Sequence, residues 1–238
     1  MADETENDLI KNLETIKAKR GYLLPHHGLL QISEPDLLSA YDTFYEVMTL
    51  RARNLSELSK EIIWLGILIT TGERIATHHL DRLSKAGGGE EHLTECVSLS
   101  AWASGAEHYA FVSENWSDFT TDFHSVRNYR VKLDALMIES CLKQGDIEMT
   151  LAAIYTATNK HYWLEEHIKG AYASGVEEDQ LAEALSLTMF PGGVPNFVDA
   201  AQIWKSMINQ KKVQASKKYK IWAEMGEQSG FGDVLSHT

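Results

Sequence analysis

Residues 148–175 have the sequence EMTLAAIYTATNKHYWLEEHIKGAYASG, and this stretch decides the fold. Its first half, up to Thr158, consists mainly of apolar and small residues. Its second half carries apolar residues at helical spacing around His167. Gly175 closes the stretch, as glycine often does at a helix C-terminus. The stretch therefore predicts an apolar helix followed by a histidine-bearing helix.

The same pattern occurs earlier in the chain. Residues 70–105 align without a gap with residues 158–193, at a shift of 88 positions, and nine of the 36 positions are identical. The identical pairs are Thr70/Thr158, His79/His167, Gly87/Gly175, Glu90/Glu178, Leu93/Leu181, Glu95/Glu183, Ser98/Ser186, Leu99/Leu187 and Gly105/Gly193. They include glycines of the kind that end helices. We therefore predict a duplicated unit with an apolar helix, a histidine-bearing helix and an amphipathic helix in succession.

The rest of the sequence also favours helices. Prolines occur only at positions 25, 35, 191 and 195, and alternating, strand-like runs are scarce. We predict an all-α protein with Gly145 as a helix stop and Asp146 or Asn159 as a helix cap. The lysine-rich tail is expected to be a solvated helix with a frayed end or, alternatively, to pack on a neighbouring subunit. The predicted segments are an N-terminal segment at 1–32, a first unit at 33–125, a second unit at 126–210 and a C-terminal tail at 211–238.

Composition limits the possible functions. The 238 residues include 22 Lys and Arg against 34 Asp and Glu, which gives a formal net charge of −12. This charge argues against nucleic acid and membrane surfaces as partners, because both attract clustered basic residues. The longest apolar run, residues 62–69, is too short to cross a bilayer, and the acidic N-terminus does not resemble a secretory signal. We therefore expect a cytoplasmic protein.

The two cysteines suggest neither a redox pair nor a metal site. Cys96 and Cys141 lie 45 positions apart, without a CxxC motif and without the Cys/His spacing of a zinc site. We expect both to be reduced, packed thiols and predict no metal.

The second unit resembles the core of the carboxymuconolactone decarboxylase and alkylhydroperoxidase D family. In the peroxidase branch of that family, a Glu is followed after eleven residues by a CxxC motif and then, after three more residues, by a His. Glu148 and His167 occupy the outer positions of this pattern, whereas Lys160 and Trp163 stand in place of the cysteines. In the first unit the same offsets fall on Lys60, Gly72, Ile75 and His79, with Glu61 next to the Glu position.

The absence of both cysteine pairs distinguishes between the two chemistries that the resemblance implies. A disulfide-exchange peroxidase needs a thiolate and a resolving thiol close together. The acid/base groups that remain suit the decarboxylase-like branch, since loss of CO₂ needs proton transfer. We therefore predict a cofactor-free lyase of alkylhydroperoxidase D-like fold that acts on a small organic acid or lactone. The alternatives are a degenerate member that binds a small molecule or partner without turnover, and residual peroxidase activity through Cys96 or Cys141. The resemblance also implies a homo-oligomer, either a trimer or a dimer.

Helical spacing places Lys160, Trp163 and His167 on one face, at i, i+3 and i+7. In the leading interpretation His167 is the general acid or base, and Glu148 orients either His167 or Lys160. Lys160 would hold the substrate carboxylate and Trp163 would form an apolar wall, while His79 is the corresponding histidine of the first unit. Alternatively, Trp163 and His167 belong to the core and Lys160 extends to solvent.

Four further residues are candidate substrate contacts. His161 and Glu166 could reach the pocket of the other unit, although His161 could instead pair with Glu165 on the helix surface. Glu73 and His78 flank the face of the first unit. Neighbouring helical side chains point about 100° apart, so His78 is poorly placed to share a metal with His79 and is expected to pair with an acid such as Glu73. The second unit is the stronger candidate for the chemistry.

Overall fold

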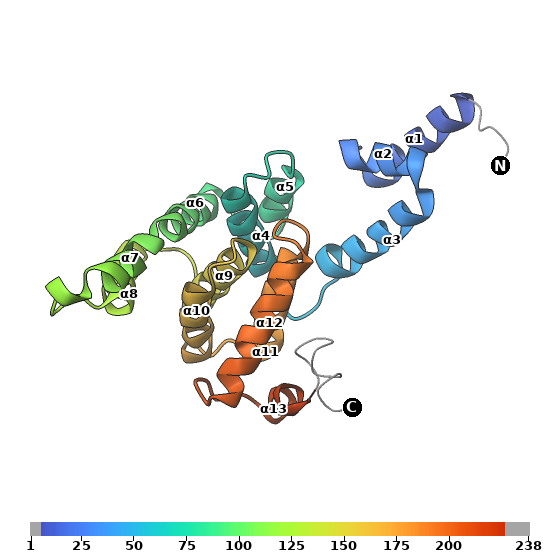
Figure 1. Cartoon of the computed structure of the whole chain (residues 1–238). Coiled ribbons are helices and arrows are strands. Elements are labelled where there is room, and N and C mark those ends of the chain that lie inside the picture. Colours follow the sequence, from blue (N-terminus) through green and yellow to red (C-terminus); the bar gives the residue numbers. More distant parts are fainter. Residues whose placement is uncertain (1–5, 227–238) are drawn as a thin grey trace. The chain divides into compact units, whose positions relative to one another are not determined.

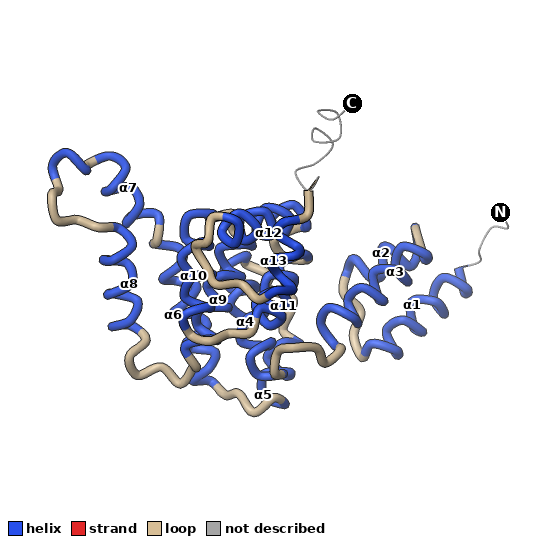
Figure 2. The backbone as a smooth tube through the Cα atoms, turned by 90° about the horizontal axis from the view of Figure 1, so that it is seen from below, coloured by secondary structure: helices blue, strands red, loops and turns tan. Residues whose placement is uncertain are grey.

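The computed structural model describes residues 6–226, and all regular elements among them are helical (Figures 1 and 2). The predicted all-α fold is therefore confirmed. The chain divides into two compact units, residues 1–51 and residues 52–238. The segment boundaries derived from the sequence stay a prediction. No helix within the described range is both long enough and apolar enough to span a membrane.

The first unit is a short array of helices. Two prolines begin α2 and α3, where the missing N–H has no helical partner to lose. A π-helical turn continues α3 and ends the unit. The elements are α1 (Glu6–Arg20), α2 (Pro25–Ser33), α3 (Pro35–Tyr45) and the π-helical turn Glu46–Leu50.

The second unit carries the remaining ten α-helices and two short 3₁₀ turns. Its first part contains α4 (Glu57–Thr71), α5 (His78–Lys85), α6 (Glu90–Gly105), α7 (Glu107–Asn115), the turn Ser117–Phe119 and α8 (Ser125–Leu136). Its second part contains α9 (Gln144–Ala157), α10 (His161–Ala173), α11 (Glu178–Ser186), the turn Leu187–Met189, α12 (Val194–Asn209) and α13 (Lys217–Glu224).

Helices α4 and α9 form the centre of the second unit. Residues 60–68 of α4 and residues 146–157 of α9 are buried without interruption, as expected for helices that are covered on all sides. Gly66 allows the two helices to approach, because a Cβ there would lie 2.5 Å from Cγ2 of Thr150. Helices α5 and α6 pack on α4, while α10 and α11 pack on α9 (Figure 1).

The order of these helices follows the predicted pattern of the duplicated unit. Each histidine-bearing helix, α5 or α10, is followed by a glycine with positive φ, +87° at Gly87 and +72° at Gly175. The duplication itself remains a proposal, supported by this shared order.

Two local predictions about α9 and α10 were wrong. Asp146 and Gly145 lie inside α9, which begins earlier, with Lys143 at its N-cap. Asn159 adopts φ of +57°, so the chain turns there and Lys160 becomes the N-cap of α10. The reason is that an N-cap residue has a backbone in the extended region, whereas Asn159 is left-handed.

Helices α7 and α8 project from the rest of the second unit in both views (Figures 1 and 2). The tip of this arm exposes Phe119, whose side chain is 87% accessible, and Trp116. The base of the arm packs against α10 through Tyr109 and Tyr129, which contact the Trp163 ring. The arm is therefore packed at its base and exposed at its tip.

Candidate functional site

The second unit contains a buried, hydrogen-bonded pair of Glu148 and His167. Nδ1 of His167 lies 2.7 Å from Oε2 of Glu148, and the two residues are 0% and 2% exposed, respectively. Glu148 projects from α9 and His167 from α10, two helices that pack along their length. Gly170 makes this approach possible, because a Cβ at that position would fall on the Glu148 carboxylate. Of the two partners considered for Glu148, His167 and Lys160, the structure places His167 against the carboxylate.

Two more side chains complete the surroundings of Glu148. Arg130 of α8 donates from Nη1 to both carboxylate oxygens, at 2.8 and 3.0 Å, and from Nη2 to the backbone carbonyl of Glu166. Gln144 donates to Oε1 at 2.9 Å. Burial acts to raise the pKa of Glu148, but the hydrogen bond from His167 and the charge of Arg130 outweigh it and hold the pKa below its ordinary value. Glu148 is therefore an ionised, fully hydrogen-bonded carboxylate.

The other ring nitrogen of His167 is also occupied. Nε2 lies 2.8 Å from the Tyr129 hydroxyl, which lies 2.8 Å from the Tyr155 hydroxyl. Burial lowers the pKa of His167, against the influence of Glu148, and raises the pKa of both tyrosines. A neutral His167 then donates from Nδ1 to Glu148 and accepts at Nε2 from Tyr129, which accepts from Tyr155. Every polar atom of this imidazole has a partner.

Trp163 packs directly beside this chain of hydrogen bonds. Its ring centroid lies 4.2 Å from that of Tyr129, and its side chain is fully buried. Its indole Nε1 has no hydrogen-bond partner in the described part of the chain. The environment is that of a core residue, which was the alternative interpretation of the sequence.

The first half of the predicted repeat contains another pair of the same kind, Glu61 with His79. Because Glu61–His79 comes earlier in the chain it is called the first pair, and Glu148–His167 is called the second pair. Nδ1 of His79, on α5, lies 2.6 Å from Oε2 of Glu61, on α4, and the two residues are 2% and 1% exposed. The Trp64 ring lies against the imidazole, with centroids 4.8 Å apart. Burial lowers the pKa of His79, although Glu61 acts in the opposite direction. His79 is therefore a neutral imidazole at neutral pH.

The two histidines differ at Nε2. Within residues 6–226, nothing forms a hydrogen bond with Nε2 of His79, whereas Tyr129 bonds the same atom of His167. When Nδ1–H donates to Glu61, the lone pair of Nε2 remains free to accept a proton. The first pair has the electronic arrangement of a general base that is held by a carboxylate.

A cavity of about 340 Å³ lies between α4 and α5, and its lining includes neither Glu61 nor His79. The lining reaches the start of α5 through Ala76 and Thr77, which precede that helix, and through Leu80, which follows His79 on it. Its walls are mainly apolar, and the exposed side chains of Glu73 and Arg74 stand among its lining. Arg74 makes no ion pair with any described residue, so its guanidinium is available to an anion. The complete lining is Leu65, Leu68, Ile69, Gly72, Glu73, Arg74, Ala76, Thr77, Leu80 and Leu93.

The structure separates Lys160 from the Glu148 pair. Its Nζ lies 3.6 Å from Oε2 of Glu107, and its side chain is 42% exposed. The expected partner, Glu148, is instead held by Arg130 and Gln144. The reason is that Lys160 lies in the turn before α10 and does not share the helical face of Trp163 and His167.

The other predicted contacts near α10 are also arranged differently. His161 lies 3.9 Å from Asp199 and does not pair with Glu165, which binds Lys212 at 2.8 Å. The carboxylate of Glu166 binds Lys169 at 2.6 Å. None of these side chains forms a hydrogen bond with the His167 imidazole, whose two nitrogens bond Glu148 and Tyr129.

In the first half of the predicted repeat, His78 is half-buried and its ring lies 4.5 Å from the ring of His79. The predicted partner of His78, Glu73, accepts a hydrogen bond from the backbone N–H of Ile75 instead. Glu73 thus remains a cavity residue, and His78 is a neighbour of the Glu61–His79 pair.

The sequence did not predict most of the side chains that form hydrogen bonds around the Glu148–His167 pair. Tyr129, Arg130, Gln144 and Tyr155 were not singled out, and Glu61 was noted only as a neighbour of the expected position. One signal was available for Glu61, because it stands 18 positions before His79, as Glu148 stands 19 before His167. Residues 129 and 130 lie outside the aligned repeat, and no local pattern marks them.

The two thiols, Cys96 and Cys141, lie in different environments, and the potential metal ligands do not form a cluster in the described part of the chain. Cys96 is buried and donates to the carbonyl of Ile62 at 3.5 Å, while Cys141 is exposed, which contradicts the expectation that both are packed. Burial raises the pKa of the Cys96 thiol to about 12, so it is not a thiolate at neutral pH. The described residues contain no group of three or more His, Cys, Asp or Glu side chains that could hold a metal ion.

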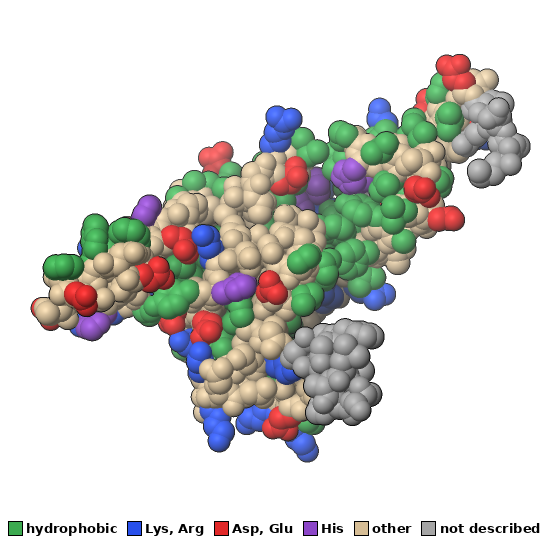
Figure 3. All heavy atoms as spheres, in the orientation of Figure 1, with side chains coloured by type: hydrophobic (Ala, Val, Ile, Leu, Met, Phe, Trp, Pro, Cys, Tyr) green, Lys and Arg blue, Asp and Glu red, His purple; other side chains and the backbone are tan. Residues whose placement is uncertain are grey.

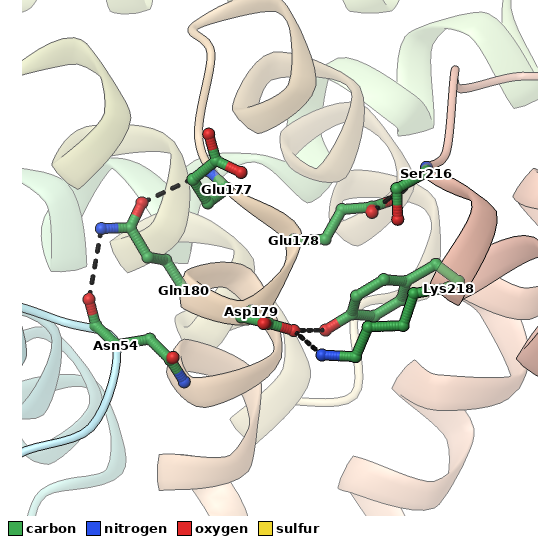
Figure 4. A pocket seen from close by; sticks show the side chains of 8 residues that line it. Asn54, Glu177, Glu178, Asp179, Gln180, Ser216 and Lys218 are labelled. Atoms are coloured by element: carbon green, nitrogen blue, oxygen red, sulfur yellow. Dashed lines mark hydrogen bonds and ion pairs between the residues drawn. The ribbon is translucent and has the colours of Figure 1, made fainter.

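A second cavity of about 340 Å³ lies at the N-terminus of α11 (Figure 4). Its acidic side chains already have partners within the unit. Asp179 binds Nζ of Lys218 at 2.6 Å and the Tyr219 hydroxyl at 2.8 Å, while Glu178 accepts from the backbone N–H of Ser216. These contacts attach α13 to α11, and we assign the cavity a structural role.

Comparisons with known proteins support one family. Residues 127–206, less than half of the chain, match the model of the carboxymuconolactone decarboxylase family. The matched region contains Glu148, His167 and Arg130. A search of curated proteins and a search of solved structures found no match.

Proposed function

Since residues 127–206 match the carboxymuconolactone decarboxylase family, we propose that this chain is a lyase that removes CO₂ from a small organic acid or lactone by acid/base catalysis. We place the proton transfer at the Glu61–His79 pair. The observation that carries this assignment is the free Nε2 of His79, whose Nδ1 is fixed 2.6 Å from Glu61. A group that must exchange a proton with substrate needs such an atom.

The cavity between α4 and α5 suits an acid with an apolar body. Hydrocarbon would contact side chains such as Leu68 and Leu80, and the carboxylate would meet the guanidinium of Arg74. Arg74 thus takes the role that the sequence gave to Lys160. The mainly apolar lining also favours the loss of charge as CO₂ leaves.

The proposed step balances with one proton taken from solvent. The substrate binds as its carboxylate, and Nε2 of His79 takes up this proton. The bond between the carboxylate carbon and its neighbour then breaks, CO₂ leaves, and the electron pair stays on the remaining carbon. That carbon takes the proton from Nε2, which leaves His79 neutral again. Glu61 stabilises the imidazolium that forms between the two transfers.

The test is a CO₂-release screen with lactones and keto acids on the wild type and on His79→Gln and His167→Gln. We expect His79→Gln to lower kcat/KM by about 10²-fold or more, which is the usual contribution of a general acid or base. His167→Gln should retain the rate per folded molecule, and His108→Gln, at an exposed histidine, serves as the matched control. Arg74→Gln should raise KM more than it lowers kcat.

Three results would contradict this proposal. Absence of CO₂ release by the wild type with every acid and lactone rejects the lyase. Normal turnover by His79→Gln rejects the assignment to the first pair. Loss of turnover in folded His167→Gln, with His79→Gln unaffected, supports the competing assignment in which His167 is the acid or base and Tyr129 leaves Nε2 when substrate binds.

A second candidate function is binding without turnover. The complete hydrogen bonding of His167 favours it, because this centre in the family-matched region needs no substrate to satisfy its polar atoms. In that case an acid that raises the melting temperature of the wild type would do the same for His79→Gln, and neither protein would release CO₂.

A further inference from the structure

Helix α3 presents an apolar stripe to solvent. Leu37, Ala40 and Phe44 stand at i, i+3 and i+7, and Val47 continues the stripe into the π-helical turn. The side chains of Leu37, Phe44 and Val47 are 55%, 40% and 40% exposed, and Ala40 is exposed as well. This 3-4-3 spacing is typical of a seam that packs on another helix.

The same surface is acidic. Residues 25–50 contain four carboxylates and no Lys or Arg. Glu34, Asp36 and Glu46 are exposed and form no ion pair within the described range. Glu34 and Asp36 lie within one helical turn of Leu37, at one end of the stripe. A complementary partner should therefore offer apolar side chains flanked by basic ones.

Helix α13 offers such a surface in the same chain. Nζ of Lys218 (Figure 4) and the Tyr219 hydroxyl both donate to Oδ1 of Asp179, and these bonds attach α13 to α11. Lys217, Lys220 and Ile221 share the opposite, exposed face at i, i+3 and i+4, and Ile221 is 56% exposed. Met225, one turn further, is 60% exposed.

The charge around α13 is opposite to the charge around α3. Residues 200–223 contain six lysines and no acidic residue, although the whole chain has a net charge of −12. Lys217 and Lys220 have no carboxylate partner among the residues described. Figure 3 shows basic side chains gathered around α13 and hydrophobic side chains on the first unit.

We propose that the α3 face of one copy binds the α13 face of a second copy. The stripe around Leu37 and Phe44 would cover Ile221 and Met225, while Glu34 and Asp36 would meet Lys217 and Lys220. Both faces belong to every chain, and Glu34, Asp36, Lys217 and Lys220 form no ion pair within residues 6–226. The two faces differ, so the contact is heterologous and passes from copy to copy until a ring closes.

The test measures the mass in solution of the full chain by light scattering after gel filtration. The wild type is expected to be an oligomer, and both Leu37→Asp and Ile221→Asp are expected to be monomers, because a buried carboxylate without a partner prevents the contact. A mixture of the two variants should give a complex of two chains only, since one intact α3 face and one intact α13 face remain. Val198→Asp, at a side chain 57% exposed on α12, is the matched control and should leave the mass unchanged.

Charge reversal gives a second, independent measurement. Lys217→Glu with Lys220→Glu should dissociate the oligomer, and adding Glu34→Lys with Asp36→Lys in the same chain should restore it. High salt should weaken the wild-type oligomer. A monomeric wild type, or an unchanged mass for Ile221→Asp with native helix content, would overturn the proposal. Single variants that alter stability while every mixture stays monomeric would place the contact within one chain and also reject it.

Discussion

The two buried Glu–His pairs of residues 52–238 differ in the number of other side chains that form hydrogen bonds with them. Glu148–His167 is surrounded by Arg130, Gln144 and Tyr129, and all its polar atoms are used. Glu61–His79 has a shorter contact, 2.6 Å against 2.7 Å, but Nε2 of its histidine is free among the described residues. The difference teaches that burial and a carboxylate partner do not by themselves make a catalytic histidine. An atom without a partner is also needed.

The largest difference between the pairs should appear in stability. Glu148→Ala leaves Arg130 and His167 without their shared carboxylate and should lower the free energy of unfolding by about 3–5 kcal/mol. Glu61→Ala leaves only the neutral His79 unpaired and should cost about 1–3 kcal/mol. Urea denaturation of both variants measures the two values.

Asp81→Ala is the control for this comparison, because the pair of Asp81 with Lys85 is solvent-exposed. It should leave the urea midpoint nearly unchanged. Equal losses for Glu148→Ala and Glu61→Ala would show that the additional partners of Glu148 do not matter.

Removal of the Tyr129 hydroxyl tests directly how much its hydrogen bond to His167 contributes to stability. Tyr129→Phe leaves Nε2 of His167 buried without a partner and should cost about 1–3 kcal/mol. Tyr155→Phe removes only the outer hydroxyl of the chain and should cost less, about 0.5–1.5 kcal/mol. The same denaturation experiment measures both, and a larger loss for Tyr155→Phe would contradict the assigned direction of the hydrogen bonds.

The pH dependence of stability should reflect both histidines. Each has a folded-state pKa below its ordinary value of 6.5, so between those two pKa values the unfolded chain binds more protons than the folded chain. Stability should therefore be constant above pH 6.5 and fall as the pH is lowered below it, by up to about 1.4 kcal/mol per pH unit for each histidine.

His79→Gln should remove one histidine's share of that slope. Thermal unfolding over a series of buffers provides the measurement. Should the variant show the full wild-type slope, His79 would not be a buried neutral imidazole.

The smallest effect is expected at the cysteines. Cys141→Ser, at an exposed thiol, should change stability by no more than about 0.5 kcal/mol. Any reduction of hydroperoxides by the wild type should persist in the Cys96→Ser, Cys141→Ser double variant, because the Cys96 pKa of about 12 keeps that thiol protonated. Loss of such activity in the double variant would revive the peroxidase alternative.

The fold was accessible from the sequence because it rests on local signals. Apolar spacing and the glycines at positions 87 and 175 predicted the helices correctly. The contact of Glu148 with His167 was one of two alternatives considered for Glu148, the other being Lys160. Lys160 was misplaced because the turn at Asn159, with φ of +57°, interrupts the helical face on which the prediction depended.

The closing residues of the second pair could not be predicted for a different reason. Arg130 lies 18 positions before Glu148, and Tyr129 lies 38 before His167. Both come from α8, whose position against α10 is fixed by tertiary packing and has no marker in the local pattern. That Nε2 of His79 has no hydrogen-bond partner among the described residues also depends on tertiary packing. The spacing of residues in the sequence does not predict it.

The crossing of α4 and α9 at Gly66 makes the two histidine centres one structure. Glu61 lies on α4 and Glu148 on α9, and these two helices pack on each other. Deleting either helix would therefore expose the buried residues of the other. Under the proposed function, Glu148–His167 takes no part in the chemistry but supports the fold around Glu61–His79. Its loss should therefore lower stability before it lowers turnover.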